Sequence, residues 1–118
     1  MPELKVSRRH LPHWHLEGSI YFVTFDCAKT VLTLKETAIV VEHITKGDDL
    51  FYDLFAVVVM PDHVHLLIRP FSGYDLSRVM KGIKGVCAHL INLHRGTKVT
   101  IWQSESYDRI VRSGREFD

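Results

Sequence analysis

Two apolar segments separated by a two-residue turn constrain the fold of this chain more than any other feature. Residues 52–60 read YDLFAVVVM and residues 63–69 read HVHLLIR, with Pro61 and Asp62 between them. Both segments are rich in β-branched and aromatic residues, and Pro-Asp favours a tight turn, so together they predict a β-hairpin. The first segment is almost entirely apolar, which indicates a central strand that is buried on both faces.

The segments before this hairpin predict a strand followed by a helix. Residues 19–26 (SIYFVTFD) have the β-branched and aromatic composition of a strand. Thr33 and Glu36 match a capping box, in which each side chain satisfies a backbone N–H group at the start of a helix. Apolar residues then recur at helical spacing as far as Lys46 and should form the buried face: Leu34, Ala38, Val41 and Ile44.

The segments after the hairpin predict a second helix and a fourth strand. Asp75 can cap the start of the helix and Gly96 can end it. The apolar face of this helix comprises Leu76, Val79, Met80, Ile83, Cys87 and Leu90. Residues 99–112 contain the fourth strand. The resulting order predicts an α+β, ferredoxin-like βαββαβ two-layer sandwich, with two helices on one face of an antiparallel sheet and the other face open.

The size and composition of the chain fit a single domain over residues 1–118. The sequence has 118 residues, of which 46% are hydrophobic and 25% are charged, as in ordinary globular proteins. No apolar run approaches the roughly 18–20 residues that span a bilayer, and the N-terminus does not resemble a secretory signal. Cys27 and Cys87 form neither a zinc pattern nor a disulfide framework. We therefore expect a cytoplasmic protein that does not associate with membranes.

Charge is distributed unevenly along the chain, although the net charge is only +1. Between residues 69 and 98, Asp75 is opposed by six basic residues: Arg69, Arg78, Lys81, Lys84, Arg95 and Lys98. Arg78, Lys81 and Lys84 recur every third residue, which predicts a basic stripe on the second helix, away from its apolar face. Such a stripe suits contacts with phosphates, although a simple solvated helix face has the same pattern.

His63 and His65 are the most informative polar residues, because they alternate at the start of the third strand. Residues i and i+2 of a strand point to the same side, so both rings should project from one face while Val64 enters the opposite layer. Two neutral imidazoles directed at one point can share a divalent metal ion. Strand histidines that are satisfied by other polar groups are the alternative. Asp62 beside them could orient a histidine from an outer position or simply form the turn.

Two enzyme classes that use paired histidines are excluded by the neighbouring residues. Histidine-triad hydrolases need a third alternating histidine, and this chain has Leu67 at that position. Metallo-β-lactamase-like hydrolases need His-x-His-x-Asp-His, and Leu67 and Ile68 break that pattern. The pair therefore indicates another kind of site.

Four blocks of sequence occur in a fixed order along the chain. They are RRHLPHW at residues 8–14, GSIYFVTF at 18–25, VVMPDHVHLL at 58–67, and IWQ at 101–103 followed by YDRI at 107–110. In this order they resemble the REP-associated tyrosine transposases, chromosomal relatives of the insertion-sequence-200 type of single-tyrosine transposase. The resemblance spans almost the whole chain and includes the histidine pair.

This resemblance implies a single-tyrosine HUH enzyme that binds single-stranded, hairpin-forming DNA. In such enzymes a divalent ion, Mg²⁺ or Mn²⁺, is held by the histidine pair, here His63 and His65, and polarises the scissile phosphate. A tyrosine hydroxyl attacks the phosphorus and forms a 5′-phosphotyrosine link, which conserves the energy of the phosphodiester bond for rejoining. A homodimer is a further option.

The nucleophilic tyrosine of this family has no counterpart at the matching position. In the family it lies on a helix after the Trp-Gln strand, in a segment resembling Tyr-Ile-x-x-Asn-Pro-Val, whereas residues 115–118 read REFD. Tyr107 is the nearest tyrosine, but it belongs to the Trp-Gln block, where packing on the sheet is the simpler role. We therefore expect a transposase-like domain without its tyrosine-bearing helix and third metal ligand, either as a remnant or as part of a longer chain.

Other candidate DNA contacts lie near the N-terminus. Arg8 and Arg9 provide charge, and Trp14 provides a ring that could stack on an unpaired base. The expected function is metal-dependent cleavage and rejoining of single-stranded hairpin DNA, and a truncated, non-catalytic single-stranded nucleic-acid-binding module is the alternative. RNA binding is a third option, because RNA-recognition motifs share this topology, although His63 and His65 occupy the face where those motifs carry stacking aromatics.

Overall fold

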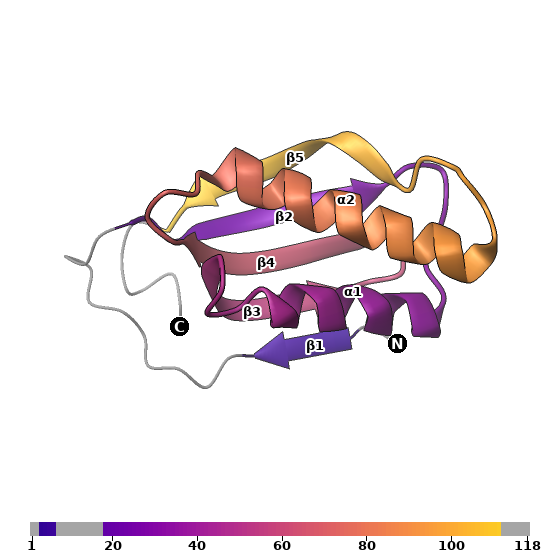
Figure 1. The fold of residues 1–118 in the computed structure, drawn as a ribbon, viewed down its shortest axis with the longest axis horizontal. Helices are drawn as coiled ribbons and strands as arrows, with labels where there is room; N and C mark the ends of the chain where they lie inside the picture. Colours follow the sequence, from indigo (N-terminus) through magenta and orange to yellow (C-terminus); the bar gives the residue numbers. More distant parts are fainter. Residues whose placement is uncertain (1–2, 7–17, 112–118) are drawn as a thin grey trace.

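All strands in the described part of the chain join one antiparallel sheet. The computed structural model describes residues 3–6 and 18–111. The strands are β1 (Glu3–Val6), β2 (Tyr21–Cys27), β3 (Tyr52–Val59), β4 (His63–Pro70) and β5 (Trp102–Ile110). They lie in the order β1-β3-β4-β2-β5, and each neighbouring pair is antiparallel (Figure 1).

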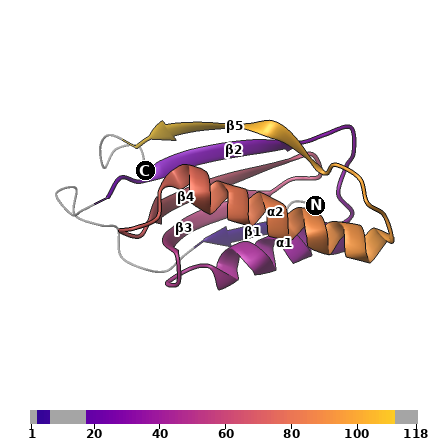
Figure 2. The same cartoon turned by 45° about the horizontal axis from the view of Figure 1, so that its top comes forward.

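Two helices cover one face of this sheet. α1 (Leu34–Lys46) follows β2, and α2 (Leu76–Arg95) follows β4. Both lie on the same side of the strands (Figures 1 and 2). From β2 onward the order is β-α-β-β-α-β, with β4 lying between β2 and β3, and this confirms the predicted ferredoxin-like sandwich. Neither helix in the described ranges is long and apolar enough to cross a membrane.

β1 is a strand that the sequence patterns did not predict. It pairs with β3 from Glu3 opposite Val59 to Val6 opposite Ala56 and forms one edge of the sheet. Four residues are too few for an alternating pattern to stand out, and short strands are common at sheet edges.

Capping contacts begin and end the helices at the predicted residues. The Thr33 side chain accepts a hydrogen bond from the Glu36 N–H group at 3.2 Å, and Glu36 accepts one from the Thr33 N–H group at 3.0 Å, which completes the capping box. Asp75 accepts from the Arg78 N–H group at 2.7 Å at the start of α2. Gly96 ends this helix with a φ of 70°, a left-handed conformation that glycine adopts without strain.

The main core lies between the helices and the sheet. Val64, Leu66 and Ile68 of β4 are buried there, together with residues of both helices. The buried face of α1 differs from the prediction, because Leu34 is 60% exposed. The residues that α1 buries are Glu36, Thr37, Val40 and Ile44. On α2, Val79, Met80, Ile83 and Cys87 are buried as predicted, together with Ile91.

A buried ion pair between the two helices explains the shifted face of α1. The Glu36 side chain is 1% exposed and accepts hydrogen bonds from Arg95 Nε and Nη2, both at 2.9 Å. The Arg95 guanidinium lowers the pKa of Glu36 to about 2. His94 also contacts Glu36, at 3.0 Å from its Nδ1 atom. The carboxylate can be buried because it is paired, so α1 turns this polar residue inward.

Candidate functional site

His63 and His65 lie together on the sheet face opposite the helices. The residues between and after them, Val64 and Leu66, point into the helix-covered core, so the two histidines project from the other side. Their ring centroids are 4.7 Å apart, with the ring planes at 77°. The structure thus brings the two predicted ligands close enough to share one ion.

The turn that precedes β4 holds His63 in place through backbone hydrogen bonds. Met60 donates its N–H group to the His63 carbonyl at 2.8 Å, which closes the predicted two-residue turn. The Pro61 carbonyl accepts from the Leu32 N–H group at 2.7 Å, and the Asp62 carbonyl accepts from the Cys27 N–H group at 2.8 Å. Segments on both sides of the turn are therefore tied to it, which favours a rigid position for the histidine.

The Nδ1 atom of each histidine already has a partner. Asp62 Oδ1 lies 2.6 Å from His63 Nδ1, and a carboxylate at that distance accepts the Nδ1 proton. Thr24 Oγ1 lies 2.8 Å from His65 Nδ1. These contacts leave Nε2 of each ring for a ligand, as in metal sites where an outer group orients the histidine.

The surroundings of His65 favour its neutral form. Burial lowers the pKa of His65, and the neighbouring His63 lowers it further, while the charge of Asp26 acts in the opposite direction. A neutral imidazole is the form that binds metal ions, because its second nitrogen keeps a lone pair. The Phe22 ring stacks beside His65, with centroids 5.5 Å apart.

Asp26 and Thr24 belong to this site, although the sequence patterns did not identify them. Asp26 lies directly opposite His63, and Thr24 lies directly opposite His65, in the pairing of β2 with β4. Residues directly opposite each other on neighbouring strands share a face. Alternation along β2 places both residues on one side, but the register with β4 that brings them beside the histidines is a tertiary feature.

An acidic cluster lies elsewhere in the molecule, at a distance from the histidine pair. In residues 3–6 and 18–111, Asp48, Asp49 and Asp53 are the one group of three such side chains with ligand atoms within 4.8 Å of one another. Asp48 accepts a hydrogen bond from the Leu54 N–H group at 2.8 Å, and Asp53 pairs with Arg69. These carboxylates therefore have structural roles, at the end of the β3–β4 hairpin away from His63.

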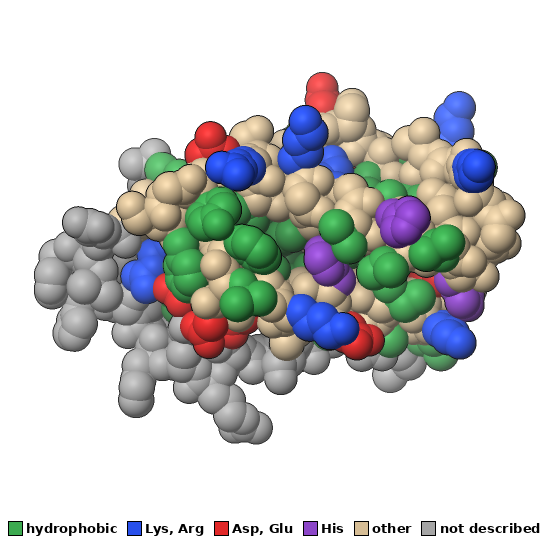
Figure 3. All heavy atoms as spheres, in the orientation of Figure 1, with side chains coloured by type: hydrophobic (Ala, Val, Ile, Leu, Met, Phe, Trp, Pro, Cys, Tyr) green, Lys and Arg blue, Asp and Glu red, His purple; other side chains and the backbone are tan. Residues whose placement is uncertain are grey.

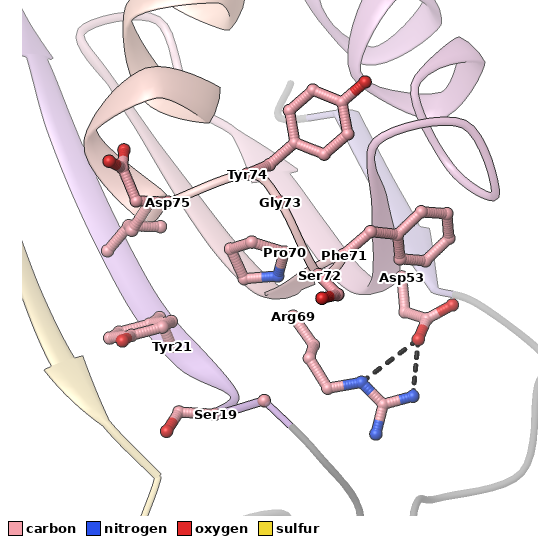
Figure 4. A pocket seen from close by; sticks show the side chains of 12 residues that line it. Ser19, Tyr21, Asp53, Arg69, Pro70, Phe71, Ser72, Gly73, Tyr74 and Asp75 are labelled. Carbon is pink, nitrogen blue, oxygen red and sulfur yellow. Dashed lines mark hydrogen bonds and ion pairs between the residues drawn. The ribbon is translucent and has the colours of Figure 1, made fainter.

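A pocket of about 630 Å³ lies at this same end of the hairpin. The Arg69 side chain points toward Asp53, and Arg69 Nε donates to Asp53 Oδ2 at 3.1 Å (Figure 4). Tyr21 and Ser19 line the other side (Figure 4). Arg69 and Asp53 neutralise each other's charge in this pocket. The pocket is remote from the histidine pair.

Tyr107 shares the open face with the histidines. It lies on β5 directly opposite Thr24, which in turn lies opposite His65. Arg109, two residues further along β5, places its guanidinium carbon 5.4 Å from the centre of the Phe22 ring. Tyr107 is 60% exposed, so much of this residue lies in solvent on the open face.

The predicted basic stripe lies on the helix-covered side, away from the histidines. Arg78 is exposed and lies over the Tyr74 ring at 5.3 Å, and Lys81 is exposed. Lys84 instead donates to the Gln103 carbonyl at 2.7 Å and to Ser106 Oγ at 3.2 Å. Lysine and arginine side chains are spread over this face with hydrophobic side chains between them (Figure 3). Lys84 therefore fastens α2 to β5, and Arg8, Arg9 and Trp14 lie outside the described residues.

Comparisons with known proteins identify the family. The sequence profile described as "Transposase IS200 like" matches residues 27–112. A solved REP-associated tyrosine transposase bound to a REP hairpin has a similar structure, with a TM-score of 0.68 and 22% identity over 92% of this chain and 66% of that one. A candidate transposase from Deinococcus radiodurans R1 has a TM-score of 0.64 and 18% identity over 92% of this chain and 90% of that one. No curated protein matches in sequence.

The chain belongs to the IS200-like transposase family, since the matched profile covers most of its length. This confirms the resemblance seen in the four sequence blocks. The two solved structures, at their low identities, establish the fold. The chain spans slightly less than two thirds of the REP-associated transposase that it resembles.

Proposed function

We propose that this chain binds a divalent metal ion and hairpin-bearing single-stranded DNA, as part of a transposase that cuts and rejoins DNA through a phosphotyrosine intermediate. The observation that carries this proposal is the histidine pair on the open sheet face, with both Nδ1 atoms partnered. Membership of a transposase family supports the same chemistry. A similar structure in complex with a REP hairpin supports the class of DNA.

The donor set at the pair fits a small divalent ion such as Mn²⁺ or Mg²⁺. His63 and His65 would bind it through Nε2, and Asp26 lies on the same face opposite His63. Imidazole and carboxylate together are ordinary ligands for Mn²⁺, and Mg²⁺ favours the oxygen donors. When bound, the ion supplies Lewis acidity at the scissile phosphate.

The protein groups around the pair contribute orientation. Asp62 and Thr24 contact the two imidazoles at Nδ1, which leaves both Nε2 atoms for a ligand. A fixed ligand geometry positions the phosphate for in-line attack, and misplacement by about 1 Å can cost about 100-fold in rate.

The attacking tyrosine is not Tyr52, Tyr21 or Tyr74. The Tyr52 hydroxyl donates to the Ile44 carbonyl at 2.6 Å inside the core, and burial raises its pKa. Tyr21 lies opposite Ile68, on the helix-covered side, and Tyr74 precedes α2. Tyr107 shares the face of the histidines, but it lies across an intervening strand from His65. We assign the nucleophile to the family's tyrosine-bearing helix rather than to Tyr107.

The test is a denaturing gel with end-labelled hairpin DNA and Mn²⁺. We expect residues 1–118 to retain the hairpin under native conditions and to form no covalent adduct. A longer chain that includes the tyrosine-bearing helix, where the gene encodes one, should form a protease-sensitive adduct that disappears in His63→Ala and His65→Ala. An adduct from residues 1–118 that is lost in Tyr107→Phe would contradict the assignment of the nucleophile.

A non-catalytic binding module is the second candidate. It is favoured by one observation: among residues 18–111, Tyr107 is the one tyrosine on the face of the histidines, and it has no precedent as a nucleophile in the sequence block to which it belongs. This candidate predicts metal-dependent retention of the hairpin with no cleavage product from any natural form of the chain.

A further inference from the structure

Tyr107 is a large aromatic side chain that is exposed on the open face of the sheet. It lies inside β5, and its side chain is 60% exposed on the open face. Its β5 neighbours Ser106 and Asp108 face the helix-covered side, where they line a groove with Lys81 and Lys84 of α2. The exposed ring is accessible to a ligand on the open face.

Tyr107 lies in one cross-strand row with the metal-binding pair. His65, Thr24 and Tyr107 are consecutive partners on β4, β2 and β5. Neighbouring strands are about 4.8 Å apart, so the backbones of His65 and Tyr107 are separated by roughly 10 Å across the sheet. The side chain between them in this row is Thr24, which is smaller than either ring. A strand of DNA with a phosphate at the histidines would therefore bring an adjacent nucleotide to Tyr107.

The neighbouring row supplies a positive charge beside this ring. Phe22 lies opposite Arg109 on β5, and the Arg109 guanidinium carbon lies 5.4 Å from the centre of the Phe22 ring. The guanidinium is thus held on the open face, two residues along the strand from Tyr107. An aromatic platform next to a cation is the combination that single-stranded nucleic acids use, with the base on the ring and the backbone near the charge.

We propose that Tyr107 is a stacking platform for an unpaired base of single-stranded DNA, next to the nucleotide whose phosphate is held at His63 and His65. This inference rests on the proposed function and adds a base-binding position to it. Stacking requires the ring and not the hydroxyl group. The role therefore differs in its consequences from that of a nucleophile, which requires the hydroxyl group.

Three substitutions separate these roles. Tyr107→Phe keeps the ring and should bind within about twofold of the wild type, whereas Tyr107→Ala should weaken binding by roughly 5- to 150-fold, the range for loss of one stacked base. Tyr107→Leu keeps apolar bulk without an aromatic ring and should resemble Tyr107→Ala. The matched control is Ile110→Ala on the same strand, because Ile110 lies opposite Tyr21 on the helix-covered side and should leave binding unchanged.

The probe is a hairpin oligonucleotide with 2-aminopurine placed in turn at each position of its single-stranded flank, titrated in Mn²⁺. We expect one or two positions to be quenched by the wild type and by Tyr107→Phe, and to lose quenching with Tyr107→Ala. Quenching that is unchanged in Tyr107→Ala, with binding still dependent on His63 and His65, would overturn the stacking role and leave the proposed function intact. Absence of any hairpin binding by the wild type would overturn both. Tyr107-dependent binding to the matching RNA and not to DNA would overturn the assignment of the ligand.

Discussion

Two side chains next to the histidine pair leave Nε2 of each ring for a ligand. One of them lies on β2 and the other in the turn before β4. Asp62 and Thr24 contact the Nδ1 atoms of His63 and His65 at 2.6 and 2.8 Å. Outer groups of this kind orient the ring of a metal ligand, and a carboxylate also fixes its tautomer because it can only accept a hydrogen bond. The metal affinity should therefore depend on residues that do not themselves touch the ion.

Loss of the Thr24 hydroxyl group should weaken metal binding without removing a ligand. Thr24→Val keeps the shape of the side chain and removes the contact with His65, so the affinity for Mn²⁺ should fall on the order of 10-fold or more. His63→Ala and His65→Ala should abolish the rise in melting temperature that Mn²⁺ produces by linkage. The measurement is the melting temperature against Mn²⁺ concentration. His89→Ala, at an exposed position of α2, is the control. If His63→Ala or His65→Ala shows the same rise in melting temperature with Mn²⁺ as the wild type, the metal site is excluded.

Gly47 and Gly82 should respond in opposite ways to the same substitution. A Cβ atom at Gly47 would collide with the Tyr52 ring, which is 2% exposed and fixed by its hydrogen bond to the Ile44 carbonyl. Gly47→Ala should therefore destabilise the protein by about 1–3 kcal/mol. A Cβ atom at Gly82 meets no atom within 4 Å, so Gly82→Ala should stabilise α2 by about 0.5–1 kcal/mol. Urea unfolding measures the change in free energy of unfolding for each variant. A change of the same sign in both variants would contradict this packing.

At the scale of elements, the two helices are joined where α1 begins and α2 ends. Arg95 near the end of α2 pairs with Glu36 in the first turn of α1 and also donates to Thr30 Oγ1 at 2.8 Å. Hydrogen bonds inside each helix cannot set the position of one helix relative to the other. This ion pair therefore contributes to the helix arrangement as well as to stability.

The stability that Glu36 provides should disappear in acid. Its pKa is lowered from 4.5 to about 2, so its contribution is complete above about pH 4.5 and is lost as the pH falls toward 2. At pH 7 Glu36→Gln should cost about 3 kcal/mol in free energy of unfolding. Urea unfolding of the wild type and the variant between pH 2 and pH 7 should show the difference narrowing in that window. Glu42→Gln, which breaks an exposed pair with Lys46, should cost less than about 0.5 kcal/mol. A difference for Glu36→Gln that stays constant with pH would exclude the ion pair as its cause.

At the scale of the whole molecule, the sheet separates the candidate metal site from the basic residues of α2. The histidines lie on the open face, and Arg78 and Lys81 lie on the helix-covered side. One phosphate cannot contact both groups. A hairpin stem, however, is wide enough to pass the β5 edge, where Lys81 lines a groove with Ser104 and Ser106.

Hairpin binding should weaken with salt, and Arg78 and Lys81 should account for part of this dependence. Each phosphate contact adds about 0.9 to the slope of log K against log salt. Replacing both residues by Gln should therefore lower the slope by up to about 1.8 units, and fluorescence anisotropy at several salt concentrations measures it. Lys84 is left unchanged because it fastens β5 to α2. If the slope of log K against log salt is unchanged in this variant, Arg78 and Lys81 do not contact the stem, and the N-terminal Arg8 and Arg9 become the candidates.

Local patterns were sufficient to predict most of the elements. The capping box at Thr33 and Glu36, the caps at Asp75 and Gly96 and the turn at Pro61 and Asp62 all lie where the sequence indicated. Each of these signals depends on residues only a few positions apart in the chain, so no tertiary information is needed to read it. The alternation that places His63 and His65 on one face is local in the same sense.

Contacts between distant residues were beyond these patterns. The register of β2 with β4 and β5 brings Asp26, Thr24 and Tyr107 onto the face of the histidines, and strand register cannot be read from the composition of a single strand. The burial of Glu36 follows from Arg95, which lies 59 residues away in sequence. Lys84 likewise has a structural contact that its helical spacing did not reveal, because β5 places the Gln103 carbonyl beside its amine. The sequence by itself therefore determined most of the elements and the histidine pair. The tertiary structure decided which side chains surround that pair, because proximity across a sheet depends on how separate segments pair.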